Sequence, residues 1–147
     1  MIQSMKHRVV VIDGMGGGIG VQIIGKLLEI DDQEREILAL GTNAVAAERM
    51  VKAGAQRGAA GENAIRVSAA LGDFIIGPVG IVIINSMMGE LTAAMAEAIL
   101  AAPGERILLP LQNSHFFLAG IEQQPLAKQC ERAVEYYRER LQVKSRR

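Results

Sequence analysis

The sequence is poor in aromatic residues and carries no net charge, and each shortage excludes a class of partner. Its 147 residues include two Tyr, three Phe and no Trp, too few for the stacked aromatic surfaces that bind single-stranded nucleic acid. Sixteen basic residues balance sixteen acidic ones, so no overall electrostatic field attracts nucleic acid or an anionic membrane. We therefore expect neither of these as a partner.

Cysteine, histidine and long apolar runs are scarce as well. The single cysteine, Cys130, cannot form an internal disulfide, which is typical of the reducing cytoplasm. Two histidines without close-spaced partner ligands do not suggest a transition-metal site. Gly77, Pro78 and Gly80 interrupt the longest apolar stretch, so no run reaches membrane-spanning length. These features predict a cytoplasmic protein without a metal site.

The remaining composition is that of one ordinary globular domain. Half of the residues are hydrophobic and 22% are charged, and the length fits a single domain over residues 1–147, with a basic tail at about 143–147. Short β-branched segments alternate with helical patterns. This order predicts a single Rossmann-like α/β domain, with a doubly wound, mostly parallel sheet and helices on both faces.

Apolar periodicity and glycine or proline breaks give the expected elements. We expect strands at about 8–13, 36–41, 56–60, 73–77, 106–111 and 116–121, and helices at about 19–28, 44–53, 61–71, 93–102 and 124–142. Within 61–71, Ile65 and Val67 leave a strand as the alternative. Asn43 and Thr92 are expected helix caps, and Gly54 ends the second helix. Residues 80–90 remain open: Ile-Val-Ile-Ile favours a strand, whereas the flanking glycine suits a helix returning over the sheet.

The most informative motif is Asp-Gly-Met-Gly-Gly-Gly-Ile-Gly at residues 13–20. It follows the apolar run 9–12 and precedes a helical pattern. Because glycine has no side chain, the backbone N–H groups of such a loop can approach an anion closely. The N-terminus of the following helix adds partial positive charge. The motif therefore predicts a phosphate-binding loop, whose expected ligand-binding residues are Asp13, Gly14, Gly16, Gly17, Gly18, Ile19 and Gly20.

Two common glycine-loop patterns do not fit this motif. The dinucleotide pattern Gly-x-Gly-x-x-Gly fails because Ile19 stands where its third glycine is required. Residues 20–26 have the spacing of a P-loop, but Leu27 replaces the hydroxyl residue that binds magnesium. The four residues before the second glycine of this match also belong to the helical pattern. We therefore reject both patterns.

A third pattern, Gly-x-x-x-Gly-Ile-Gly, fits without a gap and resembles the cofactor loop of the short-chain dehydrogenase/reductase family. The resemblance implies that Gly14 makes the turn, Gly18 admits the diphosphate and Gly20 lets the helix pack closely against the sheet. The alternative is a tight strand–helix turn that binds nothing.

The catalytic pair of that family, Tyr-x-x-x-Lys, is missing. Arg140 follows Tyr136 at that spacing, and Leu141 follows Tyr137. Asp13 also stands where that family usually has Thr or Ser. These departures argue against hydride transfer with either nicotinamide cofactor.

A second resemblance runs along most of the chain. Its motifs are Val-Ile-Asp-Gly-x-Gly-Gly-Gly-Ile-Gly at 11–20, Ala-Leu-Gly-Thr-Asn at 39–43, Gly-Glu-Asn-Ala-Ile at 61–65, Ile-Ile-Gly-Pro at 75–78 and Asn-Ser-Met-x-Gly-Glu at 85–90. On these motifs the chain resembles an uncharacterised bacterial family of short Rossmann-like proteins, a domain of unknown function. The resemblance implies the fold and a bacterial origin, and it implies no activity.

Ligands of open α/β sheets lie beyond the C-terminal ends of the strands. This rule adds Thr42, Asn43, Gly77 and Pro78 to the expected cofactor site. Neither Thr42 nor Asn43 supplies the carboxylate that usually binds the ribose of NAD, so the site would tolerate a 2′-phosphate, as in NADP, or a mononucleotide. Alternatively, Asn43 only caps a helix. His115, after a strand end, is a candidate acid/base or an ordinary loop residue.

The polar side chains of Glu62, Asn63, Asn85, Ser86 and Glu90 would line the same crevice in one of the conformations left open for residues 61–71 and 80–90. For Asn63 and Ser86 singly, helix capping is the simpler expectation.

We expect a small cytoplasmic nucleotide-binding protein that holds a dinucleotide (NAD or NADP) or a mononucleotide on loop 14–20, as a sensor, carrier or accessory subunit. One alternative is an enzyme that uses the nucleotide as cofactor or substrate, with Asp13 or His115 in proton transfer. Another is a ligand-free oligomeric scaffold. The last helix carries an apolar strip that either packs over the sheet or forms a homodimer: Leu126, Cys130, Val134, Tyr137 and Leu141.

Overall fold

The computed structural model describes residues 7–30, 34–111 and 116–145. Five parallel strands form one sheet in the order β3-β2-β1-β4-β5. Their bounds are β1 His7–Asp13, β2 Arg35–Gly41, β3 Arg57–Ala60, β4 Phe74–Pro78 and β5 Glu105–Leu109. The strand order reverses between β1 and β4, which is the topological switch point of a doubly wound sheet.

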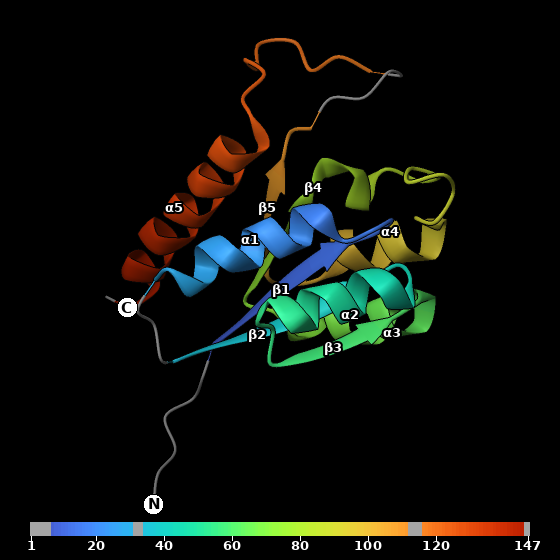
Figure 1. The fold of residues 1–147 in the computed structure, drawn as a ribbon, viewed down its shortest axis with the longest axis horizontal. Helices are drawn as coiled ribbons and strands as arrows, with labels where there is room; N and C mark the ends of the chain where they lie inside the picture. The colour runs from blue at the N-terminus through green and yellow to red at the C-terminus, as the bar shows by residue number, and fades with distance from the viewer. Residues whose placement is uncertain (1–6, 31–33, 112–115, 146–147) are drawn as a thin grey trace, which may run out of the picture.

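Helices cover both faces of the sheet (Figure 1). One face is covered by α1 (Gly18–Leu28), α2 (Ala44–Ala53) and α5 (Leu126–Ser145). The other is covered by α3 (Glu62–Ser68) and α4 (Ala93–Ala101), with the 3₁₀ turns η1 (Ala69–Leu71) and η2 (Val79–Val82). This is the predicted fold class, a single α/β domain with a Rossmann-like parallel sheet.

The central strand β1 shows why its sequence is a continuous apolar run. Val9 and Val11 are buried in the core beneath α1, α2 and α5, whereas Val10 and Ile12 are buried in the core on the opposite face. Successive side chains of a strand point to opposite faces. A strand covered on both faces must therefore be apolar at every position.

Local capping signals in the sequence are confirmed. The Asn43 side chain accepts a hydrogen bond from the Ala46 N–H at 2.8 Å at the start of α2, and Gly54 follows its last residue. The Thr92 hydroxyl accepts from the Met95 N–H at 3.2 Å at the start of α4. Each cap satisfies a backbone N–H that has no partner within its helix.

Two segments differ from expectation. Residues 80–90 form neither a strand nor an α-helix: η2 continues to Val82, and the chain then makes consecutive turns with positive φ at Asn85, Met87, Met88 and Gly89. Those φ values fit neither regular structure. The strand expected at 116–121 is also wrong, because the chain turns at Ala119 and Gly120 instead of extending along the sheet.

The apolar strip of α5 packs over the sheet. Cys130, Val134 and Tyr137 are buried in the core with α1, and Leu126 and Leu141 pack against its margin. Of the two expected arrangements, packing of this strip over the sheet is therefore the one observed. A homodimer stays a prediction, and it would need a different surface.

Candidate functional site

The glycine loop is held at both ends by the carboxylate of Asp13. Asp13 is the last residue of β1, and its side chain is 3% exposed. One carboxylate oxygen accepts from the Gly14 N–H at 2.8 Å, and the other accepts from the Gly20 N–H in the first turn of α1 at 2.7 Å. Asp13 thus positions the loop through the backbone at its two ends.

The charge on Asp13 is subject to opposing effects. Burial raises the pKa of this carboxyl, while hydrogen bonds from the N–H groups of Gly20, Gly14 and Ile19 lower it and the nearby charge of Glu90 raises it. Burial dominates, so the net shift of the pKa is upward. Because Asp13 occupies the donors of Ile19 and Gly20, an external anion must use other N–H groups of the loop.

Two backbone N–H groups of the glycine loop remain for an external anion. The N–H groups of Gly16 and Gly18 have no hydrogen-bond partner among the described residues. Gly17, by contrast, donates to the Gly14 carbonyl at 2.8 Å and makes the turn with φ 75°. Gly18 is the first residue of α1, so its free donor also lies at the positive end of the helix dipole.

A cavity of about 380 Å³ lies at the switch point, directly against this loop. Loop residues 13–19 line it, together with Pro78 at the end of β4 and Met87. Leu111, Phe116 and Leu126 add apolar surface, and Gln22 of α1 adds a polar group. The volume is at the lower end of the range typical of small-molecule sites.

The loop glycines serve different purposes. A Cβ on Gly20 would lie 2.3 Å from Met50 Sδ, and a Cβ on Gly14 would lie 2.4 Å from Thr42 Oγ1. A Cβ on Gly18 would meet no atom within 4 Å, and Gly18 has no positive φ. A side chain at 14 or 20 would therefore have to displace neighbouring side chains, whereas the space beside Gly18 is open.

Gly77 and Pro78, at the end of β4, also have different roles. A Cβ on Gly77 would lie 2.4 Å from the carbonyl oxygen of Ile12, so this glycine permits close approach of β4 to β1. Pro78 is the residue of the pair that lines the cavity.

Thr42 and Asn43 lie beside the loop but do not line the cavity; both bind Glu90. Oε1 of Glu90 accepts hydrogen bonds from Thr42 Oγ1 at 2.5 Å, Asn43 Nδ2 at 2.9 Å and the Met15 N–H at 3.0 Å. The bond from Thr42, followed by those from Met15 and Asn43, holds the pKa of Glu90 below its usual value despite some desolvation. Sequence reasoning placed Glu90 near the crevice but did not foresee that it ties three segments together.

Arg49 on α2 is a site residue that the sequence did not indicate. Its Nη1 donates to the Gly16 carbonyl at 2.7 Å, so a positive charge stands beside the loop. Arg49 is exposed and follows Asn43 by six residues, a spacing that carries no motif.

Of the other polar candidates, Ser86 lines the cavity and Asn63 does not. Asn63 and Ser86 are not caps, contrary to expectation: Asn63 lies within α3, which Gly61 precedes, and the Ser86 hydroxyl donates to the Gly80 carbonyl at 2.6 Å. His115 lies outside the described residues. Within the described ranges, no three His, Cys, Asp or Glu side chains gather into a group suited to a metal ion.

The two tyrosines lie at the opposite end of the sheet. The Tyr136 hydroxyl donates to Glu105, the first residue of β5. The Tyr137 hydroxyl lies 2.6 Å from Nε2 of His7, the first residue of β1. The glycine loop follows the last residue of β1, so neither hydroxyl is near it.

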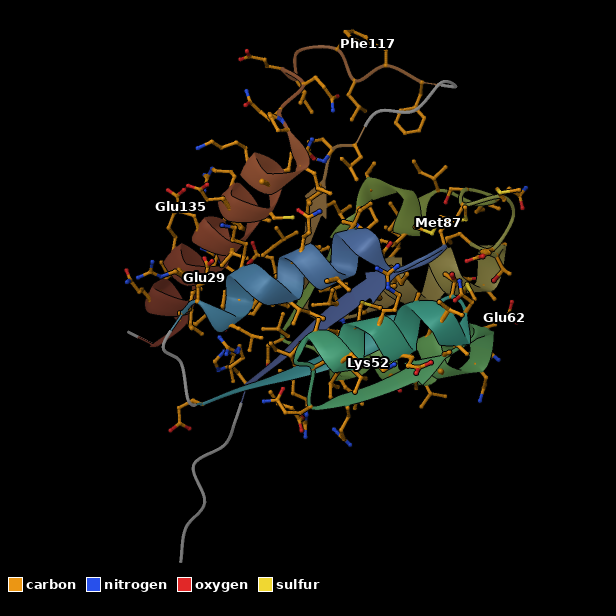
Figure 2. The ribbon with its side chains drawn as sticks, in the orientation of Figure 1. Glu29, Lys52, Glu62, Met87, Phe117 and Glu135 are labelled. Carbon is orange, nitrogen blue, oxygen red and sulfur yellow. The ribbon has the colours of Figure 1, made fainter. Side chains whose placement is uncertain are left out.

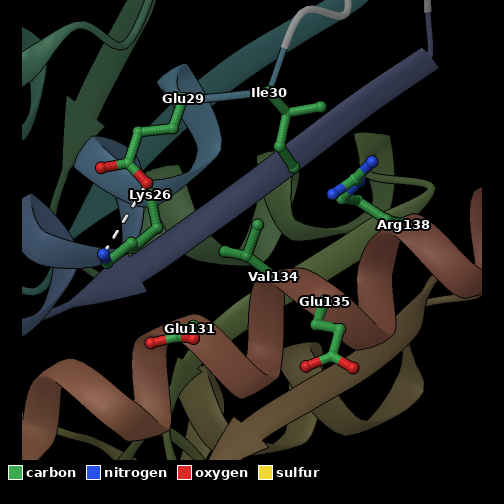
Figure 3. A pocket seen from close by; sticks show the side chains of 7 residues that line it. All are labelled: Lys26, Glu29, Ile30, Glu131, Val134, Glu135 and Arg138. Atoms are coloured by element: carbon green, nitrogen blue, oxygen red, sulfur yellow. Dashed lines mark ion pairs between the residues drawn. The ribbon is translucent and has the colours of Figure 1, made fainter.

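A larger cavity, of about 560 Å³, lies between α1 and α5 and contains no loop residue (Figure 3). Its lining mixes apolar Ile30 and Val134 with charged groups of both signs, including the Lys26–Glu29 ion pair at 3.7 Å. The cavity beside the glycine loop, rather than the larger one, has unpaired backbone donors.

The fold and loop together define a Rossmann-like α/β protein. The chain belongs to the family described as a domain of unknown function, DUF3842, whose model matches residues 8–142. No curated protein matches the sequence. In the parts of the chain that the structure describes, every helix is too short or too polar to cross a membrane.

Proposed function

We propose that this protein binds a phosphate-bearing nucleotide in the cavity at the switch point, with the phosphate on the N–H groups of Gly16 and Gly18. The observation that carries the proposal is Gly18, whose N–H is unpaired among the described residues and whose missing side chain leaves open space. A backbone donor at the start of α1 is suited to an anion. The apolar lining beyond the loop suits a nucleoside.

The donors already occupied by Asp13 and the position of Arg49 favour a phosphate held at Gly16 and Gly18 rather than deeper in the loop. Asp13 already accepts hydrogen bonds from the N–H groups of Ile19 and Gly20, so a phosphate would have to use the remaining donors. Arg49 supplies a positive charge at Gly16. A phosphate between these groups would gain two backbone hydrogen bonds and a favourable Coulomb interaction.

A sensor, carrier or accessory role in the cytoplasm suits this site better than catalysis. Both oxygens of Asp13 accept backbone hydrogen bonds, and both tyrosines lie at the far end of the sheet. Cys130 is buried, and burial raises the pKa of its thiol to about 11, which keeps it unreactive. Ser86 lines the cavity, but its hydroxyl donates to the Gly80 carbonyl at 2.6 Å. None of these described side chains therefore stands out as a nucleophile.

The test uses two glycines of the same helix. Gly18 and Gly25 both lie in α1, and a Cβ on either would meet no atom within 4 Å. Gly18→Val places its side chain beside the proposed phosphate, whereas Gly25→Val places it on the exposed side of the helix away from the loop. Calorimetry would compare both variants and the wild type against AMP, nicotinamide mononucleotide, ATP, NAD, NADP and coenzyme A.

We expect Gly25→Val to bind as the wild type does and Gly18→Val to lose roughly 30-fold in affinity, about 2 kcal/mol, because the phosphate loses backbone donors. Circular dichroism should show both variants folded. If the wild type binds none of the six compounds, or if folded Gly18→Val binds equally well, the loop is structural and the proposal fails.

A further inference from the structure

The segment comprising residues 84–91 follows η2 and reaches the ends of β1 and β2. Figure 1 shows it as the olive loop beyond the arrowhead of β1, and Figure 2 labels Met87 within it. Glu90 binds Thr42 and Asn43, directly after β2, and the Met15 N–H, directly after β1. Met87 lies over Gly14, since a Cβ built there would be 2.5 Å from Met87 Sδ.

The 84–91 segment is a fixed part of the fold. The Asn85 N–H donates to the Leu91 carbonyl at 2.7 Å, and the Leu91 side chain is fully buried in the core below. Ser86 is tied to Gly80, and Met87 packs against the same core. These contacts hold three non-glycine residues at positive φ, a conformation that costs energy and persists only where its surroundings determine it.

The segment occupies the position where a dinucleotide would place one of its halves. A doubly wound sheet holds a dinucleotide across the crevice at the switch point, with a ribose hydroxyl bound at the end of the second strand. At that position in this chain, Thr42 and Asn43 already donate to the carboxylate of Glu90. A ribose would have to displace Glu90, and a 2′-phosphate would also be repelled by its negative charge.

The other half of the crevice is open. The cavity of about 380 Å³ extends from the loop donors to Leu111, Phe116 and Leu126. Ser86 and Met87 of the 84–91 segment form one of its walls, and its lining includes neither Thr42 nor Asn43. The open space thus offers one phosphate position and one apolar compartment.

We infer that the ligand is a mononucleotide rather than a dinucleotide, because the chain's own 84–91 segment fills the half of the crevice next to β2. This inference rests on the function proposed above: the phosphate lies on Gly16 and Gly18, and the single nucleoside lies against the apolar lining.

NAD and its two halves provide a direct test, since NAD is AMP and nicotinamide mononucleotide joined through their phosphates. Titrating the full chain with all three should show that at least one half binds about tenfold or more tightly than NAD. The double variant Met87→Ala/Glu90→Ala should raise the affinity for NAD relative to that of the better half by about tenfold or more. Met88→Ala is the matched control, because Met88 is in the same segment but is 90% exposed.

The outcomes separate this inference from the proposed function. If NAD binds the wild type at least as tightly as the better half does, the inference is overturned while the proposed function stands. If a folded double variant leaves the NAD ratio unchanged, the 84–91 segment is not what excludes the dinucleotide, and the inference is also overturned. If neither half nor any other nucleotide of the panel binds, both fail.

Discussion

The two ends of the sheet differ in the ion pairs that their carboxylates make. At the N-terminal ends of the strands, Asp73 and Arg35 bind backbone groups, but Glu36 pairs with Arg8 at 2.9 Å and with Arg57 at 3.2 Å. At the C-terminal ends, the carboxylates of Asp13 and Glu90 instead bind backbone N–H groups and neutral side chains. The ion pairs link the starts of neighbouring strands, whereas the carboxylates at the other end fix loops in which the N–H groups of Gly16 and Gly18 have no partner among the described residues.

Backbone conformation follows the same division. The non-glycine residues with positive φ in the described chain are Met15, Asn85, Met87 and Met88, all at the C-terminal end of the sheet. Each such residue costs of order 1 kcal/mol or more, and conformations of this kind gather at functional sites. The comparison therefore supports a structural N-terminal end and a ligand-binding C-terminal end.

The largest expected loss of stability comes from a substitution between two strands at the C-terminal end of the sheet. Gly77→Ala places a Cβ 2.4 Å from the Ile12 carbonyl, so β4 must move away from β1. We expect a loss of about 3 kcal/mol of unfolding free energy in urea, the upper range for overpacking. Gly25→Ala is the control and should gain up to about 1 kcal/mol, since its Cβ meets open space within a helix. Equal stability of the two variants would contradict the assigned role of Gly77.

Removing the charge of Glu90 tests how the C-terminal loops are held. Glu90→Gln should cost about 1–2 kcal/mol near neutral pH, because three hydrogen bonds lose their charged acceptor. The pKa of Glu90 is lowered from 4.5 in the fold, so its stabilisation is present above pH 4.5 and is lost as the pH falls through the folded value. The stability difference between wild type and variant should therefore shrink in acid. A difference that is constant from pH 7 to pH 3 would contradict this.

Substitution of Arg49 tests whether the positive charge beside the loop contributes to ligand binding. Arg49→Ala should weaken nucleotide binding by about 1 kcal/mol, roughly fivefold, through the lost attraction to phosphate. Its stability should change little, because Arg49 is exposed. Lys52→Ala on the same helix, whose charge pairs with Glu48 at 3.0 Å, is the control and should bind like the wild type. Equal weakening of both variants would indicate a general charge effect rather than a local one.

The sequence was sufficient to predict the structure where the signals act over a few residues. The apolar run of β1, the glycines after it and the caps Asn43 and Thr92 each act within a few residues, so the first unit and the position of the loop could be predicted. The Glu90 bonds could not, because they join residues 47 and 48 positions apart. The β-branched residues at 81–84 suggested a strand, but tertiary contacts of Leu91 and Ser86 impose turns.

The separate roles of Gly18 and Gly20 were only partly readable from the motif. The match to Gly-x-x-x-Gly-Ile-Gly identified both positions, but only the neighbouring atoms show that a Cβ on Gly20 would displace the Met50 side chain whereas a Cβ on Gly18 would meet no atom within 4 Å.

The smallest expected effect is at the N-terminal end, where Tyr136→Phe removes the hydroxyl that donates to Glu105. Arg140 still bonds Glu105 at 3.0 Å, so the carboxylate keeps a partner and the urea midpoint should fall only slightly. Nucleotide affinity should be unchanged, because Tyr136 lies at the opposite end of the sheet from the loop. A screen of carbonyl substrates with NADH and NADPH should likewise show no turnover, since neither tyrosine can relay a proton to a ligand at Gly18. Cofactor-dependent reduction that disappears in Tyr136→Phe would place chemistry at the end of the sheet that we assign to stability, and the comparison would fail.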